Sequence, residues 1–395
     1  MTTLDTPTQV TTEDLIGDDL IERCRRRAAA YDRENRFFTE DLDELREAGY
    51  LRAALPRTHG GTGAGLDTIV ATQRRLAAAA PPTALALSMH LYVTGAAADL
   101  HAMGDPSVDW ILDQAAAGEI IGSGHSETGN DIPVLMSTTR AERVPGGYRL
   151  TGRKRFGSLG PVWTRLLVNA LDPTDPSDPR IVHAVVHRDD EGVHVQDQWD
   201  TLGMRASQSY DTVLDGVFVP DERVMRVVPA GDPSDPFVGA TTTWAMLQFG
   251  AIYLGIADRA FELAVGSATS KSSIAIERQT MAHHPQIQAD IAEMYIDLTC
   301  AGATLTSTAA DWPAAAVQPD WPARMMAARY VAVERALAVV DRALDVVGGG
   351  AIAAGSELQR LYRDVCCGRF NGINRYLTIE FVGKGILGVD PQPRW

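Results

Sequence analysis

The periodicity of the chain changes twice, from helical to strand-like and back, and this order limits the folds that the chain can adopt. From Thr11 to about Gly118 the sequence is rich in Ala, and its apolar residues recur at helical spacing. From about Ile121, short segments rich in Val, Tyr, Thr and Ile alternate with Gly, Asp and Pro turns, as in "RIVHAVVHRD" and "YDTVLDGVFVP". Beyond Thr241 the helical period returns in long segments. Strands and helices do not alternate, which argues against a doubly wound parallel sheet.

Three domains are expected from this order. The chain has 395 residues, which exceeds the roughly 250–300 residues that one hydrophobic core usually serves. We predict a helical domain over residues 1–120, a β domain over 121–230 that forms an antiparallel barrel or sandwich, and a helical bundle over 231–395. The segment "PAGDPSDPF" has the composition of a linker between the second and third domains. The predicted fold class is therefore mostly α with an inserted β domain.

The charge of the chain excludes some partners. The formal net charge is −15, and a polyanion needs clustered Lys and Arg, so nucleic acid is not an expected partner. A nucleotide cofactor or a coenzyme A thioester stays possible, because a few basic residues and helix N-termini are enough to hold one.

Location and metal content are also constrained. The first ten residues lack the pattern of a signal peptide, and no apolar run approaches about 18 residues, so we expect a soluble, cytoplasmic protein without a membrane partner. The four cysteines, of which Cys366 and Cys367 are adjacent, fit a reducing compartment. His183 and His187 share a strand face, but no third ligand lies near them in the sequence, so no metal site is expected.

Four stretches, in this order, carry a resemblance to a known family. They are "ELREAGYLRAALPRTHGGTGAG", "GHSETGND" with "TTRAERVPGGYRLTGRKRFGS", "DTLGMRASQSYDTVLDGVFVP" and "DVVGGGAIAAGSELQRLYRDVCCGRF". Each is similar to a segment of the acyl-CoA dehydrogenase superfamily of flavoproteins, and together they extend over nearly the whole chain. The resemblance implies that family's fold: an N-terminal helical domain, a middle β domain and a C-terminal four-helix bundle.

The resemblance assigns flavin contacts to the middle domain. Ser126 matches the hydroxyl that bonds the pyrimidine edge of the flavin ring, and Phe156 matches the aromatic side chain that covers one face of the ring. Gly157 follows Phe156, and Ser158 matches the hydroxyl near flavin N5. A hydroxyl group can both accept and donate, which suits N5 in both redox states. The alternative is that both serines only cap strand ends and that Phe156 belongs to the core.

A second group of cofactor contacts is implied in the C-terminal domain. Gly348 and Gly349 match the turn at which one subunit approaches the FAD of its neighbour, a task that needs the missing side chain of glycine. The match is imperfect, because Asp345 stands where the family has Gln and Ala351 where it has another Gly.

The phosphate contacts of the family have no clean counterpart. Its Arg-x-x-Phe-Gly segment does not occur in "SKSSIAIERQTMAHHPQIQ", where Lys271 or Arg278 could supply the positive charge. The resemblance implies FAD, with FMN as the alternative. It also implies a homodimer or homotetramer, because the family shares its flavin site between subunits.

The family's catalytic base is missing. The segment "RFNGIN" aligns Phe370, Asn371 and Ile373 with the Tyr, Glu and Thr of the family's Tyr-Glu-Gly-Thr segment, whose Glu removes the α-proton of an acyl thioester. A carboxamide cannot accept that proton, and a positioned base contributes roughly 10²–10⁴-fold. The segment "TTTWAMLQFGAIYLG", where some members carry the acid instead, has no Asp or Glu. The backbone N–H of Asn371 could still polarise a thioester carbonyl.

Two enzymatic hypotheses follow, and the first is preferred. In it the protein oxidises an acyl thioester on coenzyme A or an acyl-carrier protein, and passes electrons to an electron-transfer partner. The base would then be His125, beside Ser126, or His90, because imidazole titrates near neutral pH. Each histidine could instead be structural.

The second hypothesis is a monooxygenase similar to the dibenzothiophene monooxygenase-like and amino-sugar N-oxygenase-like members of the same fold. Such an enzyme takes reduced flavin from a separate reductase and removes no α-proton, so a carboxylate at position 371 is dispensable. His90 or His125 would then handle a proton during oxygen activation. A third hypothesis is a binding protein that kept the fold and lost the chemistry.

Overall fold

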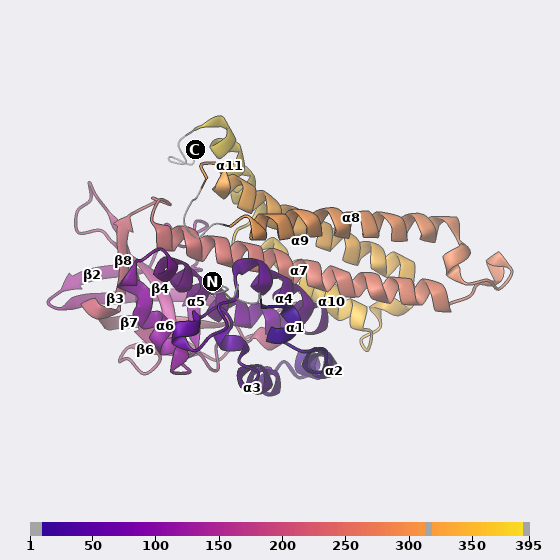
Figure 1. Cartoon of the computed structure of the whole chain (residues 1–395), viewed down its shortest axis with the longest axis horizontal. Coiled ribbons are helices and arrows are strands. Elements are labelled where there is room, and N and C mark those ends of the chain that lie inside the picture. The colour runs from indigo at the N-terminus through magenta and orange to yellow at the C-terminus, as the bar shows by residue number, and fades with distance from the viewer. Residues whose placement is uncertain (1–9, 313–317, 390–395) are drawn as a thin grey trace, which may run out of the picture.

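The computed structural model describes residues 10–312 and 318–389. The first nine residues, on which the expectation about a signal peptide partly rests, lie outside this range. The chain forms a helical part, a β part and a second helical part, in that order (Figure 1). The predicted fold class is thereby confirmed.

The first part is helical. Its helices are α1 (Thr12–Leu15), α2 (Asp18–Glu34), α3 (Thr39–Glu47), α4 (Leu66–Ala79), α5 (Pro81–Ala102) and α6 (Asp109–Ala116), with short 3₁₀ turns η1 (Tyr50–Arg52), η2 (Arg57–His59) and η3 (Pro106–Val108). α1 begins with a capping box in which Thr11 and Asp14 satisfy each other's backbone N–H. α5 begins at Pro81 and is buried on nearly every face, as its continuous apolar sequence demands.

The middle part is one sheet of eight strands. These are β1 (Ile121–Gly124), β2 (Arg140–Val144), β3 (Gly147–Gly157), β4 (Arg165–Asp172), β5 (Arg180–His187), β6 (Val193–Gln196), β7 (Tyr210–Pro220) and β8 (Val224–Pro229). Their order is β6-β7-β3-β2-β4-β5-β8, and β1 pairs with β4 in parallel. β2 also meets β4 in parallel at Arg140 and Leu171, whereas the other pairs are antiparallel. The sheet is therefore mixed and not purely antiparallel as expected.

The third part holds the longest helices. They are α7 (Pro236–Ser270), α8 (Pro285–Ala310), α9 (Trp321–Val347), α10 (Glu357–Cys366) and α11 (Arg375–Leu387). Two 3₁₀ turns lie in the β part, η4 (Arg205–Ser207) and η5 (Asp221–Arg223). Four lie in the third part: η6 (Ile274–Ile276), η7 (Met281–His283), η8 (Gly349–Ile352) and η9 (Cys367–Arg369). No helix in the described ranges is long and apolar enough to cross a bilayer.

α7 joins the parts of the molecule. It starts with Asp235, whose carboxylate accepts from the N–H groups of Phe237 and Val238, and with Pro236 at its first position. It packs against α4 and α5 on one side and against α8 and α9 on the other, and its first turns lie beside the sheet (Figure 1).

Two glycines allow this close packing. A Cβ at Gly255 of α7 would lie 2.3 Å from the carbonyl oxygen of Arg74 in α4, and a Cβ at Gly95 of α5 would lie 2.3 Å from the indole of Trp244 in α7. The two helical parts therefore form one packed body, and the sheet covers one of its ends (Figure 1).

Candidate functional site

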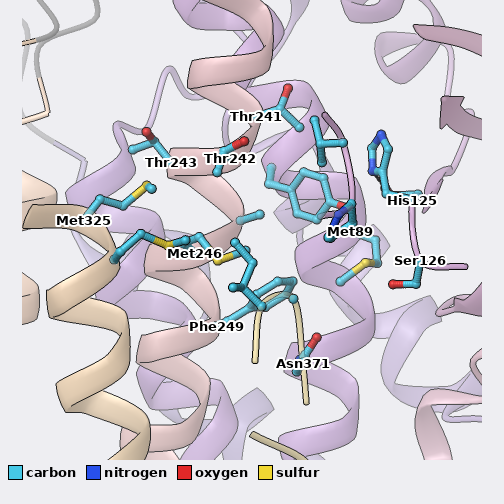
Figure 2. A pocket seen from close by; sticks show the side chains of 18 of the residues that line it. Met89, His125, Ser126, Thr241, Thr242, Thr243, Met246, Phe249, Met325 and Asn371 are labelled. Carbon is cyan, nitrogen blue, oxygen red and sulfur yellow. Dashed lines mark hydrogen bonds between the residues drawn. The ribbon is translucent and has the colours of Figure 1, made fainter. Parts of the chain in front are cut away.

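A cavity of about 1050 Å³ lies where the sheet, α5, α7, α9 and the segment after α10 meet. Ser126, Phe156, Ser158, His125 and Asn371 all line it. Figure 2 shows the wall that α7 supplies with Thr241, Thr242, Thr243, Met246 and Phe249, with Met325 of α9 and Met89 of α5 beside it, His125 and Ser126 across from it and Asn371 below. The structure thus brings together five of the predicted site residues, from segments more than 200 residues apart.

Phe156 presents an open aromatic surface to this cavity. Its side chain is 55% exposed although it stands at the end of β3, and its φ of 57° is in the left-handed region, which a bulky residue rarely adopts. Trp199 meets its ring edge-on at 6.1 Å. An aromatic ring held in a strained conformation and left uncovered is suited to stack on a planar ring such as a flavin.

Three serine hydroxyls form a chain on the same wall. Ser158 Oγ lies 2.7 Å from Ser209 Oγ, which lies 2.8 Å from Ser207 Oγ, and Ser207 donates to the carbonyl of Met204 at 2.8 Å. Each hydroxyl has one proton to donate. Because Ser207 uses its proton on Met204, Ser209 donates to Ser207 and Ser158 donates to Ser209. Ser158 is therefore left with acceptor lone pairs toward the cavity.

A buried ion pair joins the two segments that carry Ser126 and Phe156. Lys154 Nζ lies 2.6 Å from Glu127 Oε1, and both side chains are almost completely buried. Burial opposes ionisation of Glu127, but Lys154, the hydroxyl of Thr139 and the backbone N–H of Thr138 outweigh it and lower the carboxyl pKa to about 2. The pair fixes Ser126, which precedes Glu127, beside Arg155 at the end of β3, one residue before Phe156.

His125 lines the cavity and is neutral at pH 7. Its Nδ1 lies 2.7 Å from Ser123 Oγ, and its buried Nε2 has no hydrogen-bond partner among the described residues. Burial, and then His183 and Lys154, lower the pKa of the His125 imidazole well below its usual value. A histidine with so low a pKa is a weak base for removing a proton from carbon.

His90 occupies a different place from His125. It lies in α5 and is buried, but it is not part of the cavity wall. Its Nε2 bonds the carbonyl of Leu51 at 2.8 Å, and its Nδ1 accepts from the N–H of Ile121 at 3.1 Å. Both ring nitrogens are thus occupied, one by η1 before α5 and the other by β1 after it. Burial lowers the pKa of the imidazole to about 4.

Asn371 sits in the short loop between α10 and α11. Its backbone N–H donates to the carbonyl of Cys367 at 3.1 Å, so this group is not available to a thioester carbonyl as the sequence had suggested. Gly372 follows with φ +80°, and a Cβ there would lie 2.8 Å from Met246 Cε. Glycine is needed at this position because the loop presses on α7.

Only one carboxylate lies among the described residues of the cavity wall, and it is already committed. Asp235 caps α7 through two backbone N–H groups, and its other oxygen lies 3.4 Å from Arg226. Within the described part of the wall, no acid is therefore free to replace the missing glutamate as a base.

The remaining predicted contacts lie at the other end of α7. Lys271 Nζ donates to the carbonyl of Val347 at 2.7 Å, next to Gly348, so the lysine and the glycine turn are adjacent. Gly348 has φ +77° and ψ −166°, a conformation open only to glycine, and a Cβ on it or on Gly349 would meet no atom within 4 Å. Arg278 lies in the loop after Lys271 and has φ +63°.

This second group lies along α7 from the cavity of its own chain. Tyr253, the wall residue of α7 nearest to Lys271 in the sequence, precedes it by eighteen residues, which corresponds to about 27 Å of helix. That these residues serve the cofactor of a second copy stays a prediction.

Sequence reasoning missed several residues of this wall. Ser207 and Ser209 lie in the stretch "LGMRASQS", to which the sequence assigned no role. The feature that could have indicated them is a pair of serines two residues apart, directly before β7. Glu127 and Lys154 stand in the quoted stretches "GHSETGND" and "TTRAERVPGGYRLTGRKRFGS", where nothing in the sequence showed that they pair. In the described ranges, no three His, Cys, Asp or Glu side chains are grouped as a metal site would require.

Comparisons with family models cover most of the chain. The model for the acyl-CoA dehydrogenase N-terminal domain matches residues 6–108, the middle-domain model matches 123–217 and the C-terminal-domain model matches 247–374.

Two curated relatives extend over nearly the full length. L-evernosamine nitrososynthase of Micromonospora sp. is 32% identical over 98% of this chain and 92% of its own. A putative acyl-CoA dehydrogenase, YdbM of Bacillus subtilis, is 28% identical over 89% of this chain and 90% of its own.

Two solved structures have the same architecture. KijD3 in complex with FMN and dTDP-3-amino-2,3,6-trideoxy-4-keto-3-methyl-D-glucose is 26% identical, with a TM-score of 0.81 over 97% of this chain and 95% of that one. FMN-bound TdsC from Paenibacillus is 25% identical, with a TM-score of 0.80 over 94% of this chain and 96% of that one.

Proposed function

This chain belongs to the acyl-CoA dehydrogenase superfamily of flavin-dependent enzymes, and from that starting point we propose that it is a monooxygenase that receives reduced flavin from a separate reductase. The proposal reverses the order of the two hypotheses drawn from the sequence. It is supported by one observation above all: the described cavity wall has an amide at position 371 and no free carboxylate.

Thioester oxidation needs a base and a hydrogen-bond donor from the protein, and neither is available here. The α-proton needs a base, and the buried, neutral His125 has too low a pKa for that task. The thioester carbonyl needs a donor, and the N–H of Asn371 is used by Cys367. A monooxygenase needs neither group.

The serine chain supports the use of reduced flavin. When bound, a reduced flavin supplies the electrons that activate molecular oxygen, and its N5 carries a proton that oxidised flavin lacks. Ser158 offers acceptor lone pairs to the cavity, because its own proton is directed to Ser209. An acceptor at this point stabilises an N–H donor and therefore favours the reduced form.

Other residues have supporting roles in this mechanism. Phe156 holds the planar ring by stacking, and Lys154 with Glu127 fixes the segment on which Phe156 stands. His125, kept neutral by burial, shares a hydrogen bond with Ser123 through Nδ1, and its unpartnered Nε2 is left to form a hydrogen bond with a ligand. The methionine and aromatic side chains of the wall exclude water from the reaction.

We propose FMN as the flavin. Two structural relatives, KijD3 and TdsC, are described with FMN. The stretch "SKSSIAIERQTMAHHPQIQ" of this chain lacks the Arg-x-x-Phe-Gly segment that, by the resemblance, meets the pyrophosphate in the FAD-binding members. A second copy of the chain would bring Lys271 and Gly348 to the phosphate end of the cofactor.

The test compares two reactions of one preparation. Mixed without oxygen with butyryl-CoA and longer acyl thioesters, the FMN-loaded protein should keep its flavin absorbance. Supplied with NADH, a flavin reductase, FMN and oxygen, it should consume oxygen in the presence of a substrate and insert one atom from ¹⁸O₂ into the product. Bleaching by a thioester in the first mixture would overturn the proposal.

A further inference from the structure

A buried arginine without an acidic partner stands in α9. The side chain of Arg329 is only 2% exposed and forms no salt bridge with any described residue. Its Nη2 donates to the carbonyls of Gly368 at 2.9 Å and Asn371 at 2.6 Å, and its buried Nε has no hydrogen-bond partner in the described ranges. A guanidinium group keeps its proton in proteins, and a buried charge normally has a counter-ion. The missing counter-ion calls for an explanation.

The surroundings of Arg329 offset its charge only in part. Burial lowers the pKa of the guanidinium, and Tyr253 and Glu334 oppose this shift without pairing with it. Tyr253 keeps its proton, because burial raises the pKa of its phenol. Gly368 lies in η9, directly after α10, and the C-terminal end of a helix carries about half a negative charge. Part of the positive charge is therefore left over.

Arg329 lies directly behind the cavity wall. The carbonyl that it bonds belongs to Asn371, which lines the cavity, and Met325, one turn earlier in α9, lines it as well. Four residues of helix correspond to about 6 Å, so about one layer of atoms separates the guanidinium from the cavity. A charge so placed acts on whatever the cavity holds.

The titratable groups of the described wall do not cancel this charge. His125 is neutral, because burial lowers the pKa of its imidazole. Burial raises the pKa of four other wall residues, which stay protonated: Tyr92, Tyr253, Cys366 and Cys367. The carboxylate of Asp235 caps the start of α7, eighteen residues before Tyr253, which corresponds to about 27 Å of helix. The part of the cavity beside Asn371 is thus electrostatically positive.

A positive charge here favours a negative charge in the cavity. At roughly 10 Å, with an effective dielectric constant of about 20, a unit charge changes the ionisation constant of another group by about tenfold. The flavin ring that the proposed function requires can become negative when it is reduced, since it can lose the proton of N1 and keep that of N5, whereas the oxidised ring is neutral.

Building on the proposed function, we propose that Arg329 holds the reduced flavin as an anion, with N1 deprotonated and N5 protonated. Two electrons from the reductase and one proton then separate the oxidised ring from its reduced form. The second proton, which neutral reduced flavin carries on N1, goes to solvent. Arg329 is not on the wall, so it is a positioning residue that acts by its charge from behind Asn371.

The experiment measures the midpoint potential of bound FMN against pH, by stepwise reduction without oxygen. A two-electron potential falls by about 30 mV per pH unit when one proton is taken up and by about 60 mV when two are. The pH at which the slope changes is therefore the pKa of N1. In the wild-type protein this pH should lie below that of free FMN in the same buffer. A change of slope at or above the pH found for free FMN would overturn the proposal, whether or not any variant folds.

Matched variants assign the effect to the charge. Arg329→Met should raise the pKa of N1 by about one unit, a tenfold change, whereas Arg329→Lys keeps the charge and should keep the lowered pKa. Arg335→Met, in the same helix, removes an exposed arginine that pairs with Asp297, and should leave the pKa unchanged. Equal pKa values for N1 in the Met and Lys variants would mean that Arg329 only holds the backbone, and would contradict the proposal.

This inference and the proposed function fail separately. If bound FMN is reduced to the anion but no oxygen atom is inserted into a substrate, the oxygenase function is wrong and the role of Arg329 stands. If oxygen is inserted while the bound reduced flavin has the N1 pKa of free FMN, the role of Arg329 is wrong and the oxygenase function stands. A protein that binds no FMN would contradict both.

Discussion

The side-chain amide of Asn371 donates a hydrogen bond to the phenol oxygen of Tyr253 at 3.2 Å. Tyr253 is completely buried in α7, and burial raises the pKa of its phenol, so the phenol keeps its proton. The amide is therefore a partner in a neutral hydrogen bond that fixes the 370–373 loop against α7. An ionised carboxylate at position 371 could not donate this hydrogen bond, so the amide has a structural role of its own.

Asn371→Glu tests whether the dehydrogenase machinery survives around this position. A carboxylate there would restore a base, but the backbone N–H of residue 371, which would polarise the thioester carbonyl, is used by the carbonyl of Cys367. We expect no bleaching of bound FMN by butyryl-CoA without oxygen, in this variant or in the Asn371→Gln control. Rapid bleaching by the Glu variant alone would mean that only the base had been lost.

Ser209→Ala tests the serine chain. Without the acceptor at position 209, Ser158 is free to turn its proton to the cavity, and the preference for reduced flavin should fall. Loss of one hydrogen bond predicts an effect of about three- to tenfold on the ratio of FMN affinities. The midpoint potential of the bound flavin should then become more negative by about 15–30 mV.

The control for this variant is Thr72→Val, because Thr72 is buried in α4 and donates to the carbonyl of Thr68, and neither residue lines the cavity. The potential should be unchanged in that variant. Equal potentials in all three proteins would show that the serine chain does not act on the flavin.

Lys154→Met should strongly destabilise the fold. The change leaves the carboxylate of Glu127 buried without its cation, and removal of one partner from such a pair typically costs about 3–5 kcal/mol. Urea unfolding followed by circular dichroism measures the loss. Arg143→Ala, which breaks the exposed pair with Asp221, should cost less than about 1 kcal/mol. A similar small cost for both variants would contradict the assigned role of the buried pair.

Asp364 should give the protein a pH-dependent stability. Its carboxylate accepts from the N–H of Met204 at 2.6 Å, and burial, which outweighs the attraction of Arg360, raises its pKa from 3.8 to about 6. The folded form therefore holds the proton more tightly than the unfolded form. The resulting stabilisation is fully present below pH 3.8 and is lost as the pH rises through about 6.

The size of this effect follows from the shift. About two pKa units correspond to about 3 kcal/mol. Asp364→Asn should remove the dependence, so the difference in unfolding free energy between the two proteins should change between pH 4 and pH 7 by up to that amount. A constant difference across this range would mean that Asp364 titrates normally.

Much of the fold was accessible from the sequence because local patterns determined it. The strand "RIVHAVVHRD" became β5, and the helical period after Thr241 became α7. The parallel pairing of β1 with β4 was not accessible, because it joins segments 44 residues apart and depends on no local signal.

The site was only partly accessible. The sequence motifs indicated four residues that all line one cavity: Ser126, Phe156, Ser158 and Asn371. The two histidines could not be told apart by sequence, since the groups that bond His90 come from Leu51 and Ile121, far from it in the chain. The methionines are dispersed between positions 89 and 326, and a helical pattern does not tell which buried face borders an empty space.

The contact between Gly255 and the backbone of Arg74 has a consequence for protein engineering. It places α4 directly on the main chain of α7, with no side chain at residue 255 to adjust. The first hundred residues are consequently not an exchangeable module. A chimera that grafts this segment from another family member should fold only when the graft preserves the helix surface that rests on residue 255.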